Sequence, residues 1–176
     1  MLRRALVAAM LIAVMSVTAS CSWVSGLFGH HYASKPTSVS VFDATVGDCF
    51  VAPADVKAEL ADLSKVPCDV AHQQELFAKL DYQPAGSTAG NAGTTTGAGL
   101  ADAYPGDAVL DKFAQGACAE KYTGYVGIAY PDSGLWLTYL LPSARSWQQG
   151  ADRQILCFVT TTAGGSLTKS VKGSKL

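Results

Sequence analysis

Residues 107–127 read DAVLDKFAQGACAEKYTGYVG, and this stretch decides how the rest of the chain has to fold. Its apolar side chains recur at three- and four-residue intervals along one stripe: Val109, Leu110, Phe113, Ala114, Ala117, Cys118 and Tyr122. That period predicts a helix, with Asp107 as its N-cap and Gly124 or Gly127 at its end. Because one face of the helix is apolar, it must pack against a sheet.

Strand patterns lie on both sides of this helix. Residues 39–51, 63–66 and 76–80 precede it, and residues 135–141 and 154–161 follow it. Three shorter segments predict a helix at 55–63, a single helical turn at 144–149 and at most one edge strand at 166–171. The strands come in runs rather than alternating with helices. The predicted class is therefore α+β, a small and mostly antiparallel sheet packed by one main helix.

The N-terminus has the features of an export signal. Arg3 and Arg4 precede an apolar stretch that ends in small residues just before Cys21, so residues 1–20 are predicted to be a signal peptide of the lipoprotein type. The position of Cys21 resembles the bacterial lipobox, in which this thiol receives a diacylglyceryl group, although Thr18 stands where leucine is usual. Ordinary secretion, with Cys21 removed or left as a spare thiol, is the alternative.

Cysteine counting favours lipidation of Cys21. The chain has five cysteines, an odd number for an oxidising compartment, and acylation of Cys21 leaves an even four. Two acyl chains hold a protein at a membrane surface, whereas one chain binds reversibly. We therefore expect a lipid anchor on the extracytoplasmic face of the cell membrane.

The remainder divides into a tether and a domain. Residues 21–40, rich in serine and glycine, are predicted to be a flexible tether behind the lipidated cysteine, and residues 41–173 to be the exported domain. Within that domain, residues 84–103 are rich in glycine and threonine and cannot bury enough apolar surface to offset their ordering entropy. They are predicted to be a mobile loop.

The four remaining cysteines are predicted to form two disulfides. Of three pairings, we favour Cys49 with Cys68 and Cys118 with Cys157. The two disulfides close loops of about 20 and about 40 residues. In the chain-entropy model they add roughly 3 and 4 kcal/mol to the free energy of unfolding. No close pair such as Cys-x-x-Cys occurs, which argues against zinc binding and thiol redox catalysis. We expect no metal and no cofactor.

Several short motifs occur in a recognisable order. They are Val46-Gly47-Asp48-Cys49-Phe50, Val66-Pro67-Cys68 followed by His72 and Glu75, a helix with Cys118 before Tyr125-Val126-Gly127, and Pro142 with Trp147, Gly150, Asp152, Arg153 and Cys157. Over about residues 41–172 this order resembles the actinobacterial septum formation family, with Ala71 replacing a usual proline and Ala151 inserted. The resemblance implies an exported, membrane-tethered protein with a role at the division septum and no established reaction.

His72, Glu75 and Arg153 are the candidate partner-binding residues. His72 and Glu75 suit an acid–base or binding patch beside the first disulfide, or His72 is a turn residue whose ring bonds a nearby carbonyl. Arg153 suits an anionic partner, or an ion pair with Asp48 or Asp152, and we favour the structural role. No nucleophile elbow or phosphate loop is present, so no catalytic residue is assigned.

Charge and motif content narrow the class of function. Lys and Arg number 13 against 14 Asp and Glu, a formal net charge of −1 with no basic run, which excludes a nucleic-acid partner. The expected function is a non-enzymatic structural or binding module of the envelope, contacting cell-wall or division proteins. The alternative is an envelope enzyme or sensor with a cleft near His72, Glu75 and Arg153.

Overall fold

The computed structural model describes residues 35–53, 59–84, 103–162 and 165–176. These ranges cover most of the predicted exported domain. The predicted signal peptide, Cys21 and almost all of the predicted loop at 84–103 lie outside them.

Six strands form one antiparallel sheet in the order β1-β3-β2-β4-β6-β5. The strands are β1 (Thr37–Ser40), β2 (Cys49–Val51), β3 (Asp62–Val66), β4 (Gln74–Asp81), β5 (Leu135–Leu140) and β6 (Gln154–Thr161). The helices are α2 (Asp107–Val126), the 3-10 turn η1 (Tyr130–Asp132) and α3 (Ala144–Gly150). The predicted α+β class, with one main helix, is confirmed.

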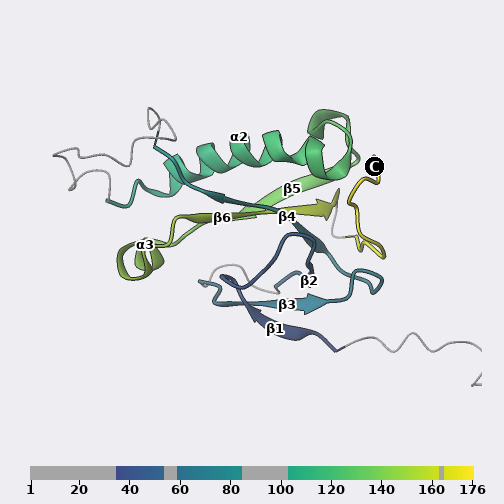
Figure 1. The fold of residues 1–176 in the computed structure, drawn as a ribbon, viewed down its shortest axis with the longest axis horizontal. Helices are drawn as coiled ribbons and strands as arrows, with labels where there is room; N and C mark the ends of the chain where they lie inside the picture. Colours follow the sequence, from purple (N-terminus) through teal and green to yellow (C-terminus); the bar gives the residue numbers. More distant parts are fainter. Residues whose placement is uncertain (1–34, 54–58, 85–102, 163–164) are drawn as a thin grey trace, which may run out of the picture. The chain divides into compact units, whose positions relative to one another are not determined.

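Helix α2 covers one face of β4, β6 and β5 (Figure 1). Its buried side chains include most of the predicted stripe and extend it by one turn: Leu110, Ala114, Cys118, Tyr122, Tyr125 and Val126. The helix ends at Gly127, whose φ of 88° is the left-handed conformation that glycine adopts at least cost. Its N-cap is Gly106 rather than the predicted Asp107, which lies in the first turn.

The sheet carries a hydrophobic cluster on each face. The α2 cluster lies between α2 and β4, β6 and β5, and includes Phe77, Ile155 and Val159. The second cluster lies on the opposite side, where β1, β3 and β2 pass across β4 and β6 (Figure 1), and includes Phe50 and Phe158. Strands β4 and β6 each bury a run of consecutive residues, 75–78 and 155–159, because both of their faces are covered there.

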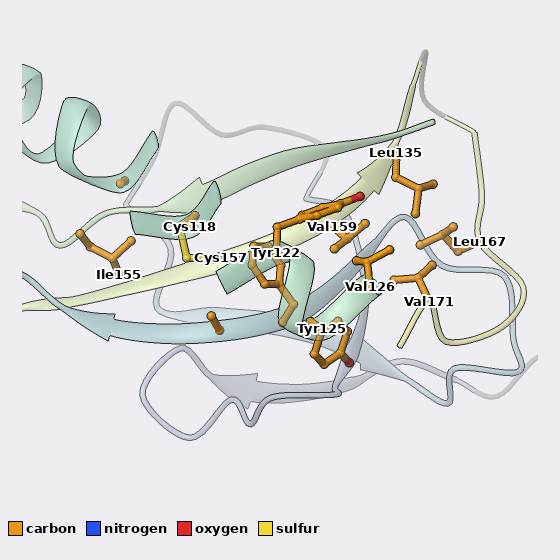
Figure 2. Close-up of a cluster of buried hydrophobic side chains, with 13 residues drawn as sticks. Cys118, Tyr122, Tyr125, Val126, Leu135, Ile155, Cys157, Val159, Leu167 and Val171 are labelled. Carbon is orange, nitrogen blue, oxygen red and sulfur yellow. A yellow bond between two sulfur atoms is a disulfide. The ribbon is translucent and has the colours of Figure 1, made fainter. Parts of the chain in front are cut away.

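Each predicted disulfide is present. Cys49 is bonded to Cys68 and Cys118 to Cys157, with Cα–Cα distances of 5.2 and 5.7 Å. The first joins β2 to the turn after β3, and the second joins α2 to β6 inside the α2 cluster (Figure 2). The favoured pairing is confirmed, and each crosslink ties together elements that are distant in sequence.

Four local predictions differ from the structure. The strand expected at 39–51 is two strands, and β1 begins at Thr37, inside the predicted tether. The helix expected at 55–63 is wrong at its end, because Asp62 and Leu63 pair with β1 as part of β3; residues 54–58 are not described. The expected edge strand at 166–171 is reduced to one bridge between Leu167 and His72. None of the described helices combines the length and apolar character needed to cross a bilayer.

Candidate functional site

His72 lies just before β4, in a short segment that the end of the chain covers. Its backbone N–H donates to the Leu167 carbonyl at 3.0 Å and its carbonyl accepts from the Leu167 N–H at 2.7 Å. The imidazole is fully buried, and Nδ1 lies 2.7 Å from the Val70 carbonyl oxygen. Because a carbonyl oxygen only accepts, Nδ1 carries a proton. Nε2 has no hydrogen-bond partner among the described residues.

Glu75 is the second buried polar residue, and it has three donors. Its Oε1 accepts from the Tyr125 hydroxyl at 2.5 Å and from the Ser170 hydroxyl at 2.6 Å, and its Oε2 accepts from the Val171 N–H at 2.8 Å. Burial, and then the hydrogen bond to Glu75 and its charge, raise the pKa of Tyr125. The tyrosine is therefore the proton donor in this contact, and the carboxylate is satisfied inside the protein.

His72 and Glu75 together hold the C-terminal segment, residues 165–176, against the domain. Leu167 and Val171 point into the α2 cluster beside Val126 (Figure 2), with Leu167 bridged to His72 and Val171 bonded to Glu75. Two further backbone bonds join this segment to the end of α2. The pair thus fastens the end of the chain to the start of β4.

Cys49, His72 and Glu75 are close enough to suggest a metal site, since one ligand atom from each lies within 4.8 Å of the others. However, the Cys49 sulfur is bonded to Cys68, and zinc binds the free thiolate. The Glu75 oxygens already accept three hydrogen bonds. In this disulfide form the cluster offers a metal only the Nε2 atom of His72.

Arg153 is engaged at another place, where α3 meets the start of β6. Its guanidinium lies 3.7 Å from the centroid of the Trp147 ring, and Nη1 donates to the carbonyls of Trp147 and Asp152, each at 2.9 Å. These contacts give Arg153 a structural role, which is the role that the sequence analysis favoured. Asp48, one of its suggested ion-pair partners, forms an ion pair with Lys65 at 2.6 Å.

The structure does not bring Arg153 together with the other two candidates. Glu75 is paired with Val159, whereas Arg153 directly precedes Gln154, which pairs with Asp81 at the far end of β4. Six residues of strand at about 3.3 Å each place the two sites roughly 20 Å apart. The suggested cleft shared by His72, Glu75 and Arg153 is therefore wrong.

Two cavities are lined by residues of β5 and of the chain around β3, and the larger of them also reaches Asp107 at the start of α2. The larger, about 1010 Å³, runs between α3 and the chain that follows β1, and the smaller, about 290 Å³, lies under β5. His72, Glu75 and Arg153 line neither of them. The apolar floor of both includes Leu60 and Leu140, two residues that the sequence did not single out for a site.

The sequence also missed the donors around Glu75. Ser170 and Tyr125 lie 95 and 50 positions away in the chain, so no local pattern joins them to the carboxylate. The one available signal is Glu75 itself, a carboxylate directly before the apolar run Leu76-Phe77-Ala78. Such a group requires hydrogen-bond donors from elsewhere in the fold.

A comparison with protein families bears on this domain as a whole. The family model described as septum formation matches residues 46–175, well over half of the chain. The chain belongs to the septum formation family. The matched region includes both disulfides, His72, Glu75 and nearly all of the C-terminal segment of this septum formation domain. No curated protein and no solved structure matched the chain.

Proposed function

We propose that this member of the septum formation family is a non-enzymatic binding module of the cell envelope that takes part in septum formation. In this proposal a diacylglyceryl group on Cys21 holds it on the extracytoplasmic face of the cell membrane, where it contacts cell-wall or division proteins. The family match supports a role in septum formation.

The burial of His72 and Glu75 is the observation that carries the non-enzymatic part of the proposal. A general acid or base has to come within hydrogen-bond reach of a substrate proton. Both side chains have an exposed fraction of 0%. Their hydrogen bonds are with Val70, Tyr125 and the C-terminal segment, so their polar atoms, apart from Nε2 of His72, serve the fold.

The disulfides support the extracytoplasmic part of the proposal. Disulfides persist in oxidising compartments and are rare in the cytosol. All four cysteines within the described residues are paired, which leaves Cys21 as the odd thiol of the chain. A cysteine that follows an apolar N-terminal stretch and has no partner in the domain fits the role of the lipid attachment site.

The septal role is tested by localisation in dividing cells. The full-length chain, fused to a fluorescent protein that matures outside the cytoplasm, is expected to be enriched at mid-cell. A uniform distribution along the envelope contradicts the septal role. A Cys21→Ser variant, imaged in parallel, is expected to leave the membrane and so separates anchoring from septal binding.

The non-enzymatic role is tested by two variants of His72. In His72→Asn the side-chain amide stands close to the position of Nδ1, so it can still donate to the Val70 carbonyl, while Nε2 is lost. We expect His72→Asn to restore division in a null strain as well as the parent does. A chain that keeps both disulfides and fails to restore division supports the enzyme or sensor instead. His72→Leu, which loses the hydrogen bond as well, is the matched control for folding.

A further inference from the structure

Strand β5 is an open edge of the sheet. It pairs with β6 on one side, and no strand of the described residues pairs with its other side. Its sequence, LWLTYL, contains no charge and no proline, which are two of the usual means of protecting an edge strand. The opposite edge, β1, is only four residues long, and three of them are polar. Of the two edges within the described residues, β5 is therefore the one suited to pairing with another strand.

The exposed side chain on this edge is an aromatic residue. Trp136 has an exposed fraction of 60%, the largest among the exposed apolar residues of the described chain. Leu135, Leu137 and Tyr139 pack with the α2 cluster, so Trp136, Thr138 and Leu140 lie on the opposite face of β5. Tryptophan is one of the residues enriched at protein–protein interfaces relative to the rest of the surface.

A cavity lies on the same face of the same strand. Its volume is about 290 Å³, and its lining includes Leu60, Leu63, Thr138, Leu140 and Phe158. Leu140 also lines the larger cavity, so it marks the boundary between the two hollows. The edge thus carries both a protruding ring and an apolar hollow, separated by a few residues along β5.

We propose that two copies of the chain pair through β5, antiparallel, about a two-fold axis at Thr138. Opposed residues in an antiparallel pair share a face, so self-pairing can join only residues of the same face. Centred on Thr138, the pairing sets each Thr138 opposite the other and each Trp136 opposite the second copy's Leu140. The two sheets become one continuous sheet across the dimer.

The protruding ring and the hollow identify the second copy as the occupant. With Trp136 opposite Leu140, the ring of each copy lies at the mouth of the other copy's cavity. A two-fold interface repeats every contact, so one ring and one hollow per chain are matched twice. Thr–Thr pairs, as at the two-fold axis, are among the favourable cross-strand neighbours. This inference goes beyond the proposed function and holds with or without a septal role.

A cysteine on the two-fold axis tests the pairing directly. In Thr138→Cys the two opposed Cα atoms would lie roughly 4.5–5.5 Å apart, within the range that a disulfide spans. The full-length chain, purified in mild detergent and treated with a copper–phenanthroline oxidant, is expected to give a covalent dimer on a non-reducing gel. The unsubstituted chain, oxidised in the same way, is the control for crosslinking through Cys21.

Gly134→Cys is the matched control, because it leaves Trp136 in place and a Cβ at this position meets no other atom within 4 Å. The two copies of this position are offset by eight residues along the strand, about 26 Å at 3.3 Å per residue, which is too far for a disulfide. We therefore expect at least a tenfold smaller dimer fraction than with Thr138→Cys, although position 134 is also exposed. Equal crosslinking at both positions, or no dimer at position 138, overturns the proposal. A crosslink to a different protein overturns it as well.

A second measurement needs no introduced cysteine, so it tests the proposal even if the Thr138→Cys chain fails to fold. Sedimentation of the unsubstituted full-length protein is expected to show a dimer, and Trp136→Lys a monomer with both disulfides intact. An unsubstituted chain that stays monomeric at tens of micromolar overturns the proposal. A Trp136→Lys chain that still dimerises also overturns the proposal, because the Trp136 ring would then contribute nothing to the dimer.

Discussion

The two halves of the sheet are built differently. Strands β4, β6 and β5 lie under α2, and their cluster contains thirteen buried residues with Cys118–Cys157 inside it. Strands β1, β3 and β2 have no covering helix among the described residues, and their cluster contains seven buried residues, none of them Cys49 or Cys68. A crosslink therefore adds to an existing core in one half and replaces part of a core in the other.

The largest expected effect comes from removing the disulfides one at a time. Cys118→Ala/Cys157→Ala is expected to lower the free energy of unfolding by about 4 kcal/mol, and Cys49→Ala/Cys68→Ala by about 3 kcal/mol, because the first closes the longer loop. The two double variants are also expected to destabilise different parts of the sheet. Hydrogen exchange should show loss of protection throughout the sheet for the first and mainly in β1, β2 and β3 for the second.

Urea unfolding of the full-length chain, with exchange mapped by mass spectrometry, measures both effects. A uniform loss of protection in the Cys49/Cys68 variant would mean that the two halves unfold as one unit. That result would remove the distinction between them.

The next effect concerns Glu75, which ties the C-terminal segment to β4. In Glu75→Gln the amide NH2 replaces one carboxylate oxygen: in place of Oε2 it faces the Val171 N–H, a donor against a donor, and in place of Oε1 it forces the Tyr125 and Ser170 hydroxyls to accept instead of donate. The charge-assisted bonds are lost in both orientations, and we expect a loss of about 2 kcal/mol. Ser170→Ala removes one donor and is expected to cost about 1 kcal/mol. Both changes should speed exchange of the Val171 amide. Unchanged exchange at Val171 in Glu75→Gln would show that the carboxylate does not hold the segment.

Much of this arrangement can be predicted from the sequence, because its signals are local. The stripe on α2 repeats within the helix, and the apolar runs of β4 and β6 indicate strands covered on both faces. Cysteine counting left three possible pairings, and the favoured one of these is the pairing present. The class, the main helix and both crosslinks could therefore be predicted without coordinates.

The parts that could not be predicted depend on distant residues. The sequence of β1, TSVS, is short and polar, and it is a strand only because β3 pairs with it. Asp62 and Leu63 continue a helical pattern, but pairing with β1 overrides their propensity. The roles of Tyr125 and Ser170 follow from contacts with Glu75 across long separations in the chain.

A smaller effect is expected at Lys79, which links the two halves. From β4 its Nζ donates to the carbonyls of Phe42 at 3.0 Å and Ala44 at 2.8 Å, fastening the loop between β1 and β2. Lys79→Met keeps the apolar stem and is expected to cost about 1.5 kcal/mol. Lys112→Met on the exposed side of α2 is the control, with less than about 0.5 kcal/mol expected in urea unfolding. Equal losses in the two variants would contradict a linking role for Lys79.

The smallest effect is a pH dependence confined to the half with the smaller cluster. Burial raises the pKa of Asp48, but hydrogen bonds from Lys65 and Thr45 outweigh it, so the pKa lies below its ordinary value of 3.8. A lowered pKa means that Asp48 stabilises the fold above pH 3.8 and that this contribution is lost as the pH falls through the folded-state value. The contribution is expected to be under about 1 kcal/mol.

Asp48→Asn tests this dependence. Its free energy of unfolding should fall less steeply with acid than that of the parent below pH 3.8, in a pH series of urea unfolding. Lys65→Met, which removes the ion-pair partner but leaves the Thr45 hydrogen bonds, should also reduce the slope, though by less. Parallel slopes for the parent and both variants would show that the ion pair contributes nothing to acid stability.

The most direct test of the exported, disulfide-stabilised module is the intact mass of the full-length chain after extraction from membranes under non-reducing conditions with a thiol-alkylating reagent. We expect a chain that begins at Cys21, carries a diacylglyceryl group there and takes up no reagent at Cys49, Cys68, Cys118 or Cys157. An unacylated chain in the membrane fraction, or a folded chain alkylated at these four cysteines, would contradict an exported lipoprotein held together by two disulfides.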